Sequence, residues 1–231
     1  MTSAQPNPVI PSRYAEALGE QDPIEALRKA PKRVKKLVRD LSEKQLSKRP
    51  AEGKWSIKEV IAHLADGEVI IGSRLRFAAA MDRATLTSWD EKLFAERLGV
   101  ERARTKDLLA SFADVRAANI ELLERLDESA LDRVAIHAER GPESVRTMVA
   151  MYAGHDVIHE RQIERVLEFL SASKSEKKAR KKAEEERARQ EQALANAAKK
   201  ARKAEKKTAR AEPAAPKKDK KSKSRPAPVA V

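Results

Sequence analysis

The stretch M-Y-A-G-H-D-V-I-H-E-R-Q-I, residues 151–163, decides how the chain can fold. Side chains at steps of three or four residues line one face of an α-helix. Here that face carries, in order, Met148, Tyr152, His155, His159, Ile163 and Val166. The two histidines therefore interrupt an apolar stripe from within. The stretch predicts an amphipathic helix that turns two imidazoles, one helical turn apart, toward the core of a helical protein.

The rest of the chain up to about residue 172 has the same helical periodicity. Asp22, Pro23 and Glu25 form one N-terminal capping signal, and Ser56 with Glu59 forms another. The stripes and caps predict four long helices, at 22–40, at 56–80, at 105–126 and from about 143 onward. No segment alternates at period two with β-branched residues, so we expect no sheet. We predict an all-α protein, a four-helix bundle over residues 22–172 preceded by a flexible N-terminal segment at 1–21.

Residues 173–231 form a basic, low-complexity tail. From Lys174 onward the tail holds 21 Lys or Arg and 8 Asp or Glu, which accounts for the whole formal net charge of +13. It contains no aromatic residue and no isoleucine, so it cannot bury enough apolar area to offset its ordering entropy. We predict that it is helical in part to about residue 210 and disordered beyond. Such a tail is typical of non-specific binding to nucleic acid or to another anionic surface.

The composition limits the chemistry and the location of the protein. The chain contains no cysteine, which excludes a thiolate nucleophile and any thiolate-bound metal. No stretch approaches 18 uninterrupted apolar residues, so we expect no transmembrane segment. The N-terminal residues lack the pattern of a signal peptide. We therefore expect a cytoplasmic protein.

Three of the four histidines suit a shared metal site. His155 and His159 form an H-x-x-x-H pair, and His63 lies on the inward side of another capped helix. Facing helices of a bundle supply such ligands, and three imidazoles leave a coordination position open for water or substrate. The alternative is a pair of buried histidines held by hydrogen bonds to the backbone or to Asp66 and Asp156.

The surroundings of these histidines indicate which metals and helper groups to expect. Neutral imidazoles without thiolates suit zinc, nickel, copper or iron, and we favour a divalent zinc or nickel ion. Asp66, Asp156 and Glu160 are candidates for orienting a ligand ring or accepting a proton. His137 lies in a connection among charged residues, and we expect it at the surface. The connection at 81–101, which contains Trp89, is expected to form the outer wall of a pocket.

Several motifs together resemble the DinB-like, or YfiT-like, superfamily of metal-dependent proteins. They are G-K-W-S-I-K-E-V-I-A-H-L-A-D-G-E at 53–68, L-T-S-W-D-E at 86–91, H-A-E-R-G-P-E-S-V-R-T at 137–147 and the stretch at 151–163. The resemblance covers about residues 22–170 and does not include the tail. It implies an up-down-down-up bundle with a metal held by His63, His155 and His159. Members resembling this group include S-transferases and isomerases that use a low-molecular-weight thiol, and they often pair as homodimers.

These observations favour a metal-dependent transferase or hydrolase with a small-molecule substrate. The metal would activate a water or a diffusible thiol cosubstrate, because the chain has no thiol of its own. One alternative is a non-catalytic metal-binding protein of a stress response, in which the ion stabilises the bundle. Another is a nucleic-acid-associated protein that acts through its basic tail. The sequence does not indicate the substrate.

Overall fold

A computed structural model describes residues 9–209 of the chain. The chain divides into two compact units, Met1–Lys174 and Ser175–Val231. The second unit is helical up to Ala209, and every described side chain from Lys174 to Lys203 is exposed. The disorder predicted beyond residue 210 lies outside the described residues. Within residues 9–209, no helix combines the length and apolarity that a bilayer span requires.

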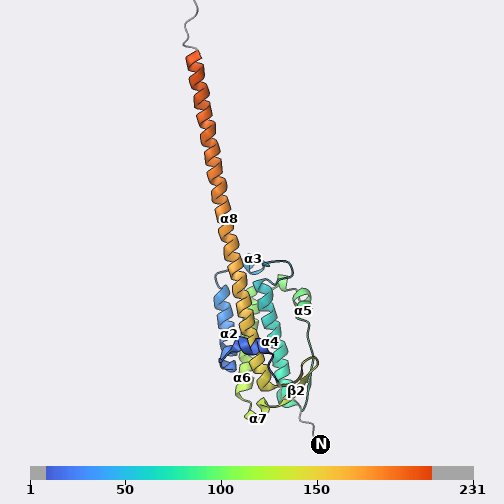
Figure 1. Cartoon of the computed structure of the whole chain (residues 1–231). Helices are drawn as coiled ribbons and strands as arrows, with labels where there is room; N and C mark the ends of the chain where they lie inside the picture. Colours follow the sequence, from blue (N-terminus) through green and yellow to red (C-terminus); the bar gives the residue numbers. More distant parts are fainter. Residues whose placement is uncertain (1–8, 210–231) are drawn as a thin grey trace, which may run out of the picture. The chain divides into compact units, whose positions relative to one another are not determined.

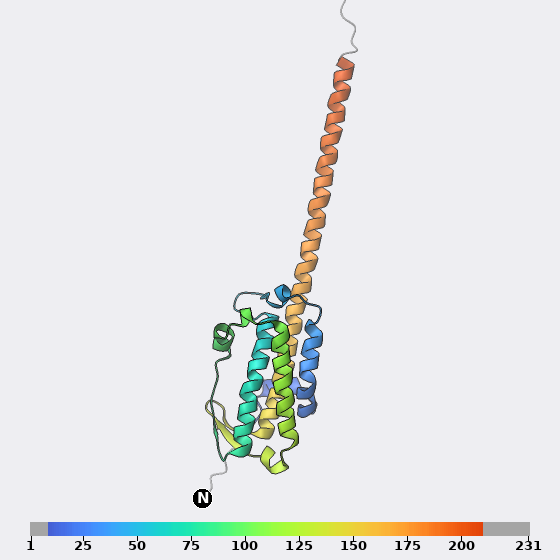
Figure 2. The same ribbon diagram turned by 180° about the vertical axis from the view of Figure 1, so that it is seen from behind.

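Four long helices build the first unit and form a four-helix bundle. They are α2 (Pro23–Val38), α4 (Ile57–Ala80), α6 (Thr105–Glu124) and the first turns of α8 (Val145–Ala209). Helix α2 and the start of α8 run in one direction, and α4 and α6 run in the other (Figures 1 and 2). The predicted up-down-down-up bundle is therefore confirmed. Because α4 and α6 are parallel, the chain between them must return along the length of the bundle.

Short elements occupy the connections between the long helices. Helix α3 (Glu43–Leu46) follows α2, helix α5 (Glu91–Arg97) and a 3₁₀ turn (Val100–Arg102) lie in the return segment, and α7 (Glu128–Leu131) follows α6. The predicted capping signals are present at the helix starts. The Asp22 carboxylate accepts the Glu25 N–H at 2.8 Å, and Ser56 and Glu59 form a reciprocal capping box. Local sequence therefore determines where α2 and α4 begin.

A small sheet lies at the end of the bundle where α8 begins, and the expectation of no sheet is wrong. Strand β1 (Thr85–Leu86) pairs in parallel with β2 (Val134–His137), which pairs antiparallel with β3 (Gly141–Ser144). Strands of two to four residues are too short to show an alternating pattern in the sequence. Because β3 occupies residues 141–144, helix α8 starts at Val145 rather than near 143.

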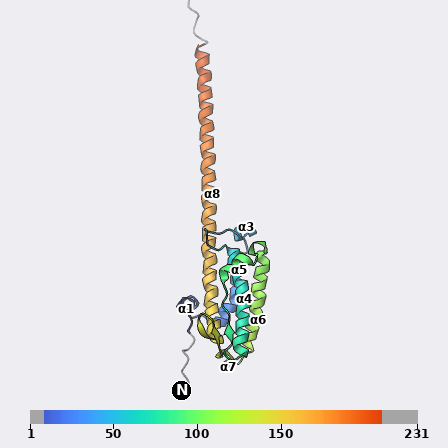
Figure 3. The same ribbon diagram turned by 90° about the vertical axis from the view of Figure 1, so that its right-hand side faces the viewer.

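The N-terminal segment contains a packed helix, so the prediction of a flexible segment at 1–21 is wrong for residues 12–18. Helix α1 (Ser12–Leu18) lies beside the first turns of α8 (Figure 3), and its Ala17 and Leu18 are buried. The close approach depends on Gly154 of α8. A Cβ added there would lie 2.1 Å from the carbonyl oxygen of Tyr14. The glycine therefore admits the backbone of α1 against α8.

The bundle core consists of two apolar clusters with a polar layer between them. The cluster near the sheet includes Leu27, Ile71, Leu75, Ile120, Val149 and Ala153, and the other includes Val34, Val60, Ile61, Phe112 and Ile163. On α4, α6 and α8, a group of buried polar residues falls in sequence between the two clusters. This group includes Glu68, Arg116, Asn119 and Asp156. On α8, His155 and His159 fall in the same interval, whereas His63 of α4 lies among residues of the second cluster.

The packing of α1 predicts opposite effects for two glycine substitutions in helices. Gly154→Ala should destabilise the fold by about 1–3 kcal/mol, because the new methyl group collides with backbone that cannot move without displacing α1. Gly67→Ala on α4 is the matched control, since its nearest neighbour would be an atom of Trp89 at 3.9 Å. The control should stabilise by up to about 1 kcal/mol through helix propensity. Urea unfolding of both variants tests this, and equal effects would contradict the contact.

Candidate metal centre

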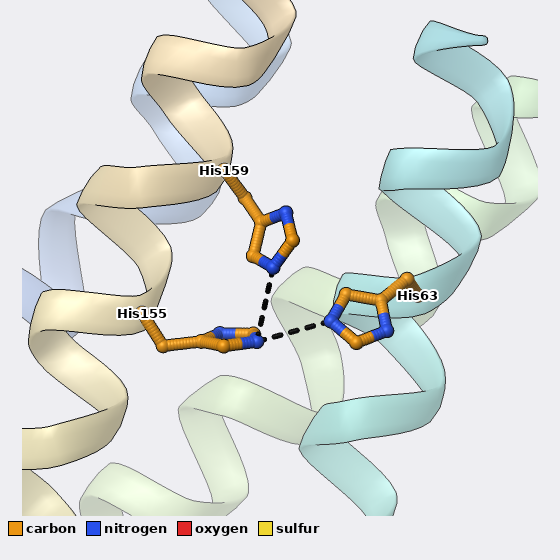
Figure 4. Close-up of side chains that lie close together, drawn as sticks. All are labelled: His63, His155 and His159. Carbon is orange, nitrogen blue, oxygen red and sulfur yellow. Dashed lines mark hydrogen bonds between the residues drawn. The ribbon is translucent and has the colours of Figure 1, made fainter. Parts of the chain in front are cut away.

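The side chains of His63, His155 and His159 converge on one point between α4 and α8 (Figure 4). Nε2 of His155 lies 3.0 Å from Nε2 of His63 and 3.1 Å from Nε2 of His159. One nitrogen of each ring lies within 4.8 Å of the others. The H-x-x-x-H spacing places two rings on one face of α8, and the antiparallel packing of α4 supplies the third.

The nitrogen geometry fits a bound cation better than a set of hydrogen bonds. A ring nitrogen offers either one N–H or one lone pair, so Nε2 of His155 cannot form a normal hydrogen bond to both neighbours. A tetrahedral zinc ion with Zn–N bonds of about 2.0–2.1 Å would hold ligand nitrogens about 3.4 Å apart. The observed separations of 3.0 and 3.1 Å are close to that value. Three nitrogen donors with no thiolate match zinc, nickel, copper or iron.

Each ring has a different neighbour. Nδ1 of His159 lies 2.8 Å from the amide oxygen of Gln162, so it carries the proton and leaves the Nε2 lone pair free. Nδ1 of His155 lies 3.8 Å from the Asp156 carboxylate, beyond hydrogen-bond distance, and has no hydrogen-bond partner within the described residues. The His63 ring stacks on Trp89 at 5.3 Å between centroids. These contacts hold the Nε2 atoms toward one another.

Two of the imidazoles are held neutral, which is the form that binds a metal. Burial, together with the nearby His155 and His159, lowers the pKa of His63 from 6.5 to about 2. Burial and the nearby His155 lower the pKa of His159 to about 3. Protons therefore do not compete for these two nitrogens at neutral pH.

A buried ion-pair network lies directly behind the histidines. Arg116 donates to the carboxylates of Asp156 and Glu68, each at 2.7 Å, and to the carbonyl oxygen of Leu27. Asn119 adds a hydrogen bond to Glu68 at 2.8 Å. Burial alone would raise the pKa of Asp156, but the charge of Arg116 outweighs it and lowers the pKa. Asp156 is therefore an anion beside His155.

The three carboxylates expected to orient a ligand ring or accept a proton are Asp66, Asp156 and Glu160, and they have different positions. Asp156 lies beside His155, as described above. Asp66 is half-buried on α4, and burial raises its pKa. Glu160 forms a bidentate ion pair with Arg33 of α2, with the shortest contacts at 2.8 Å. Within residues 9–209, neither Asp66 nor Glu160 forms a hydrogen bond or ion pair with the three histidines.

A pocket of about 190 Å³ adjoins the cluster. His63 and His155 line it together with Trp89 and Glu91 from the return segment. The expected contribution of the 81–101 connection to the pocket wall is therefore confirmed. The Glu91 carboxylate lies 4.0 Å from Nε2 of His63 and is exposed.

The fourth histidine is also part of this pocket, and the expectation of a surface residue is wrong. His137 is only 1% exposed and lines the pocket wall. It ends strand β2, where alternate residues point inward, so Ala135 and His137 are both buried. The stretch V-A-I-H gave no signal of this burial, because the strand is short and the more apolar Val134 and Ile136 are the half-exposed pair.

Other residues that shape the site had weaker signals in the sequence. Gln162 follows His159 by three residues, a spacing that brings the two side chains together on a helix. Glu91 follows the N-cap residue Asp90 at the start of α5. Arg74 lies on α4, three turns beyond His63, and reaches the pocket only because its long side chain turns toward β1.

The fold and the cluster define a class of four-helix bundle with three inward-facing imidazoles beside a pocket. Residues 26–163 match the sequence model of the DinB superfamily, and the chain belongs to that family. The solved structure of "YfiT from Bacillus subtilis", described as "a probable metal-dependent hydrolase with an unusual four-helix bundle topology", superposes with a TM-score of 0.58. It is 18% identical, and the match covers 71% of this chain and 93% of that one.

Similar proteins of other bacteria carry a related name. One from Oceanobacillus iheyensis, called a "putative metal-dependent hydrolase", is 28% identical over 145 residues, which is 61% of this chain and 81% of the relative. A protein of the same name from Bacillus mycoides is 23% identical over 148 residues, or 64% of this chain and 85% of the relative. The matched regions leave the basic tail out of the comparison with the family.

The neutral histidines predict a pH-dependent stability of the metal-free chain. Their folded pKa values, about 2 for His63 and about 3 for His159, lie below the ordinary 6.5. The unfolded chain therefore takes up protons that the folded chain does not, so stability is fully present above pH 6.5 and falls on acidification. Between pH 5 and 6, each histidine should contribute a slope of about 1 kcal/mol per pH unit.

Urea unfolding with a chelator present measures this slope. In the double variant His63→Gln, His159→Gln, the slope of the unfolding free energy between pH 5 and 6 should be about 2 kcal/mol per pH unit smaller than in the natural chain. Equal slopes in the two proteins would show that both imidazoles take up protons in the folded state, which contradicts their neutral burial.

Proposed function

We propose that His63, His155 and His159 hold one divalent transition metal ion, zinc or nickel, and that the protein is a metal-dependent hydrolase. The convergence of three Nε2 atoms beside a pocket carries this proposal. The names of the relatives support the hydrolase class. A structural metal site is usually closed by four protein ligands, whereas three leave a position for a reactant.

A divalent ion at this position supplies Lewis-acid chemistry, because it lowers the pKa of a water or thiol that it binds. The residues of the chain supply the rest. Gln162 keeps the His159 ring in the orientation that presents Nε2, and Asp156 places a carboxylate beside His155. Trp89 covers one face of His63 and narrows access of solvent to the cluster. The pocket beside the cluster receives the substrate.

Glu91 is our candidate for the proton acceptor. Its carboxylate lies 4.0 Å from Nε2 of His63, and its side chain lines the pocket. A base must lie within hydrogen-bond reach of the nucleophile, directly or through one water. Helix α5 positions Glu91 in its first turn, after Asp90 caps the helix through the N–H groups of Lys92 and Leu93.

A thiol-dependent transferase is the alternative use of the same centre. The chain has no cysteine, so the thiol would have to be a diffusible cosubstrate. Assays on ester and amide substrates, with and without an added low-molecular-weight thiol, separate the two reactions. The cluster and the pocket, as described, are lined by residues between Pro11 and His159. Binding of the basic tail to nucleic acid or to another anionic surface stays a prediction from the sequence.

Metal content tests the ligand set directly. The zinc-loaded natural chain should hold about one ion, whereas His63→Ala, His155→Ala and His159→Ala should each lose most of it after dialysis, since a two-ligand site binds weakly. His137→Gln is the matched control and should keep its metal. Elemental analysis measures this. Unchanged metal in His159→Ala would refute the assignment.

A lower melting temperature with chelator, without turnover of any substrate, would favour the non-catalytic alternative.

The role of Glu91 predicts a separation of activity from metal binding. Glu91→Gln should lower kcat by about 10²-fold or more, as expected for loss of a general base, while metal content stays unchanged. Glu96→Gln on the same helix removes a charge of the same kind from an exposed position and should retain activity. Full activity of Glu91→Gln would contradict the assignment. Loss of metal in Glu91→Gln would identify it as a ligand instead.

A further inference from the structure

A second group of polar side chains lines the same pocket as the histidine cluster. Arg74, Ser88 and His137 come from α4, from the residues after β1 and from the end of β2. Arg74 is 4% exposed and His137 is 1% exposed. Within the described residues, each of the three has a buried polar atom without a hydrogen-bond partner: Nε of Arg74, Oγ of Ser88 and Nε2 of His137. Such atoms cost free energy unless a ligand or water satisfies them.

The hydrogen bonds of His137 determine which of its nitrogens carries the proton. The single lone pair of its Nδ1 is shared by the backbone N–H groups of Glu139, at 3.2 Å, and Arg140, at 3.3 Å. Nδ1 therefore presents a lone pair, and in the neutral ring the proton is on Nε2. The unpartnered atom of His137 is thus a hydrogen-bond donor. Burial, with the charges of Arg140 and Arg74, lowers the pKa of His137, which is consistent with a neutral ring.

Arg74 is held in place by its other nitrogens. Nη1 donates to the Tyr152 hydroxyl at 2.9 Å, and Nη2 donates to the carbonyl oxygen of Thr87 at 2.5 Å. The Nε–H remains without a partner. A guanidinium whose ends are fixed presents this donor in a preorganised direction.

The small sheet brings the other two donors together. Leu86 of β1 is the register partner of His137 in the parallel pair β1–β2, and the Ala138 N–H donates to the Leu86 carbonyl at 3.1 Å. Ser88 follows β1 by two residues, so both side chains leave the same end of this strand pair. The sheet therefore positions one wall of the pocket.

We propose that Arg74, Ser88 and His137 bind an oxyanion, a carboxylate or phosphate group, of the molecule that occupies the pocket. Two of the unpartnered atoms can only donate, and the Ser88 hydroxyl can also donate, so an acceptor with several lone pairs satisfies all three. The charge of Arg74 strengthens such bonds to an anion. This inference rests on the proposed function in one respect: that the occupant is the substrate of the metal centre.

The other charges of the pocket are compatible with an anion. Arg13 and Arg140 line it as cations, and Glu91 and Glu139 line it as anions. Arg140 is paired with Glu143 through two contacts. Arg74 has no carboxylate partner among the ion pairs of residues 9–209. Its charge is therefore available to a ligand.

Titration of inorganic phosphate and of succinate into the metal-free full-length chain tests the proposal, with calorimetry and the fluorescence of the two tryptophans, Trp55 and Trp89, as readouts. At 0.15 M chloride, at least one anion should bind saturably at one site per chain. His137→Gln and Arg74→Gln should each weaken binding about tenfold, and Ser88→Ala should weaken it several-fold. Thr87→Ala, an exposed neighbour with a hydroxyl, is the matched control and should bind as the natural chain does.

A stability measurement guards against variants that merely misfold. Ser88→Ala removes a hydroxyl with no partner in the described structure, so its melting temperature should be unchanged or higher while anion binding falls. Saturation by phosphate alone or by succinate alone identifies the class of oxyanion. The proposal is overturned if neither anion saturates, or if Ser88→Ala and His137→Gln bind as tightly as Thr87→Ala.

Metal content, measured on the same samples, separates this proposal from that of the metal centre. A chain that binds zinc but neither anion would overturn the oxyanion site alone. A chain that binds an anion but no zinc would overturn the metal centre alone.

Discussion

The structure depends on one buried guanidinium. Arg116 of α6 bonds Glu68 of α4 and Asp156 of α8, and all three side chains are almost fully buried between two apolar clusters. Removing one partner from such a network leaves a buried charge unpaired, at a cost of about 3–5 kcal/mol. Rotation or sliding of α4, α6 or α8 would do the same. The network therefore selects one register and one rotation for these three helices.

The position of the three histidines follows from that constraint. Asp156 neighbours His155 on α8, and Glu68 lies little more than one turn beyond His63 on α4, so the rotation that pairs the carboxylates also turns the imidazoles toward each other. The parallel arrangement of α4 and α6 forces a long return segment, and that segment supplies Trp89 and Glu91 to the pocket. The fold thus places the three histidines on long helices and Trp89 and Glu91 on a connection, a division common in binding sites.

The sequence predicted the parts of the structure that depend on local, periodic signals. Helical spacing placed His155 and His159 on the inward face of α8, and capping boxes marked the start of α4. The bundle topology and the choice of His63 came from the resemblance to a family. The features that were missed depend on contacts between distant segments: the partners of Arg116, the burial of His137 in a four-residue strand, and the packing of α1 on Gly154. No local pattern in the sequence indicates such pairings, because the burial that makes each partner necessary exists only in the folded protein.

The central claim is that three imidazoles share one ion, and X-ray absorption spectroscopy of the zinc-loaded full-length chain tests it most directly. We predict a first shell of nitrogen or oxygen atoms at about 2.0–2.1 Å, with the outer-shell scattering of three imidazole rings. In His63→Ala, any zinc that is retained should show the outer-shell scattering of two imidazole rings instead of three. A shell without imidazole scattering, or zinc bound with the same spectrum in His63→Ala, would contradict the account.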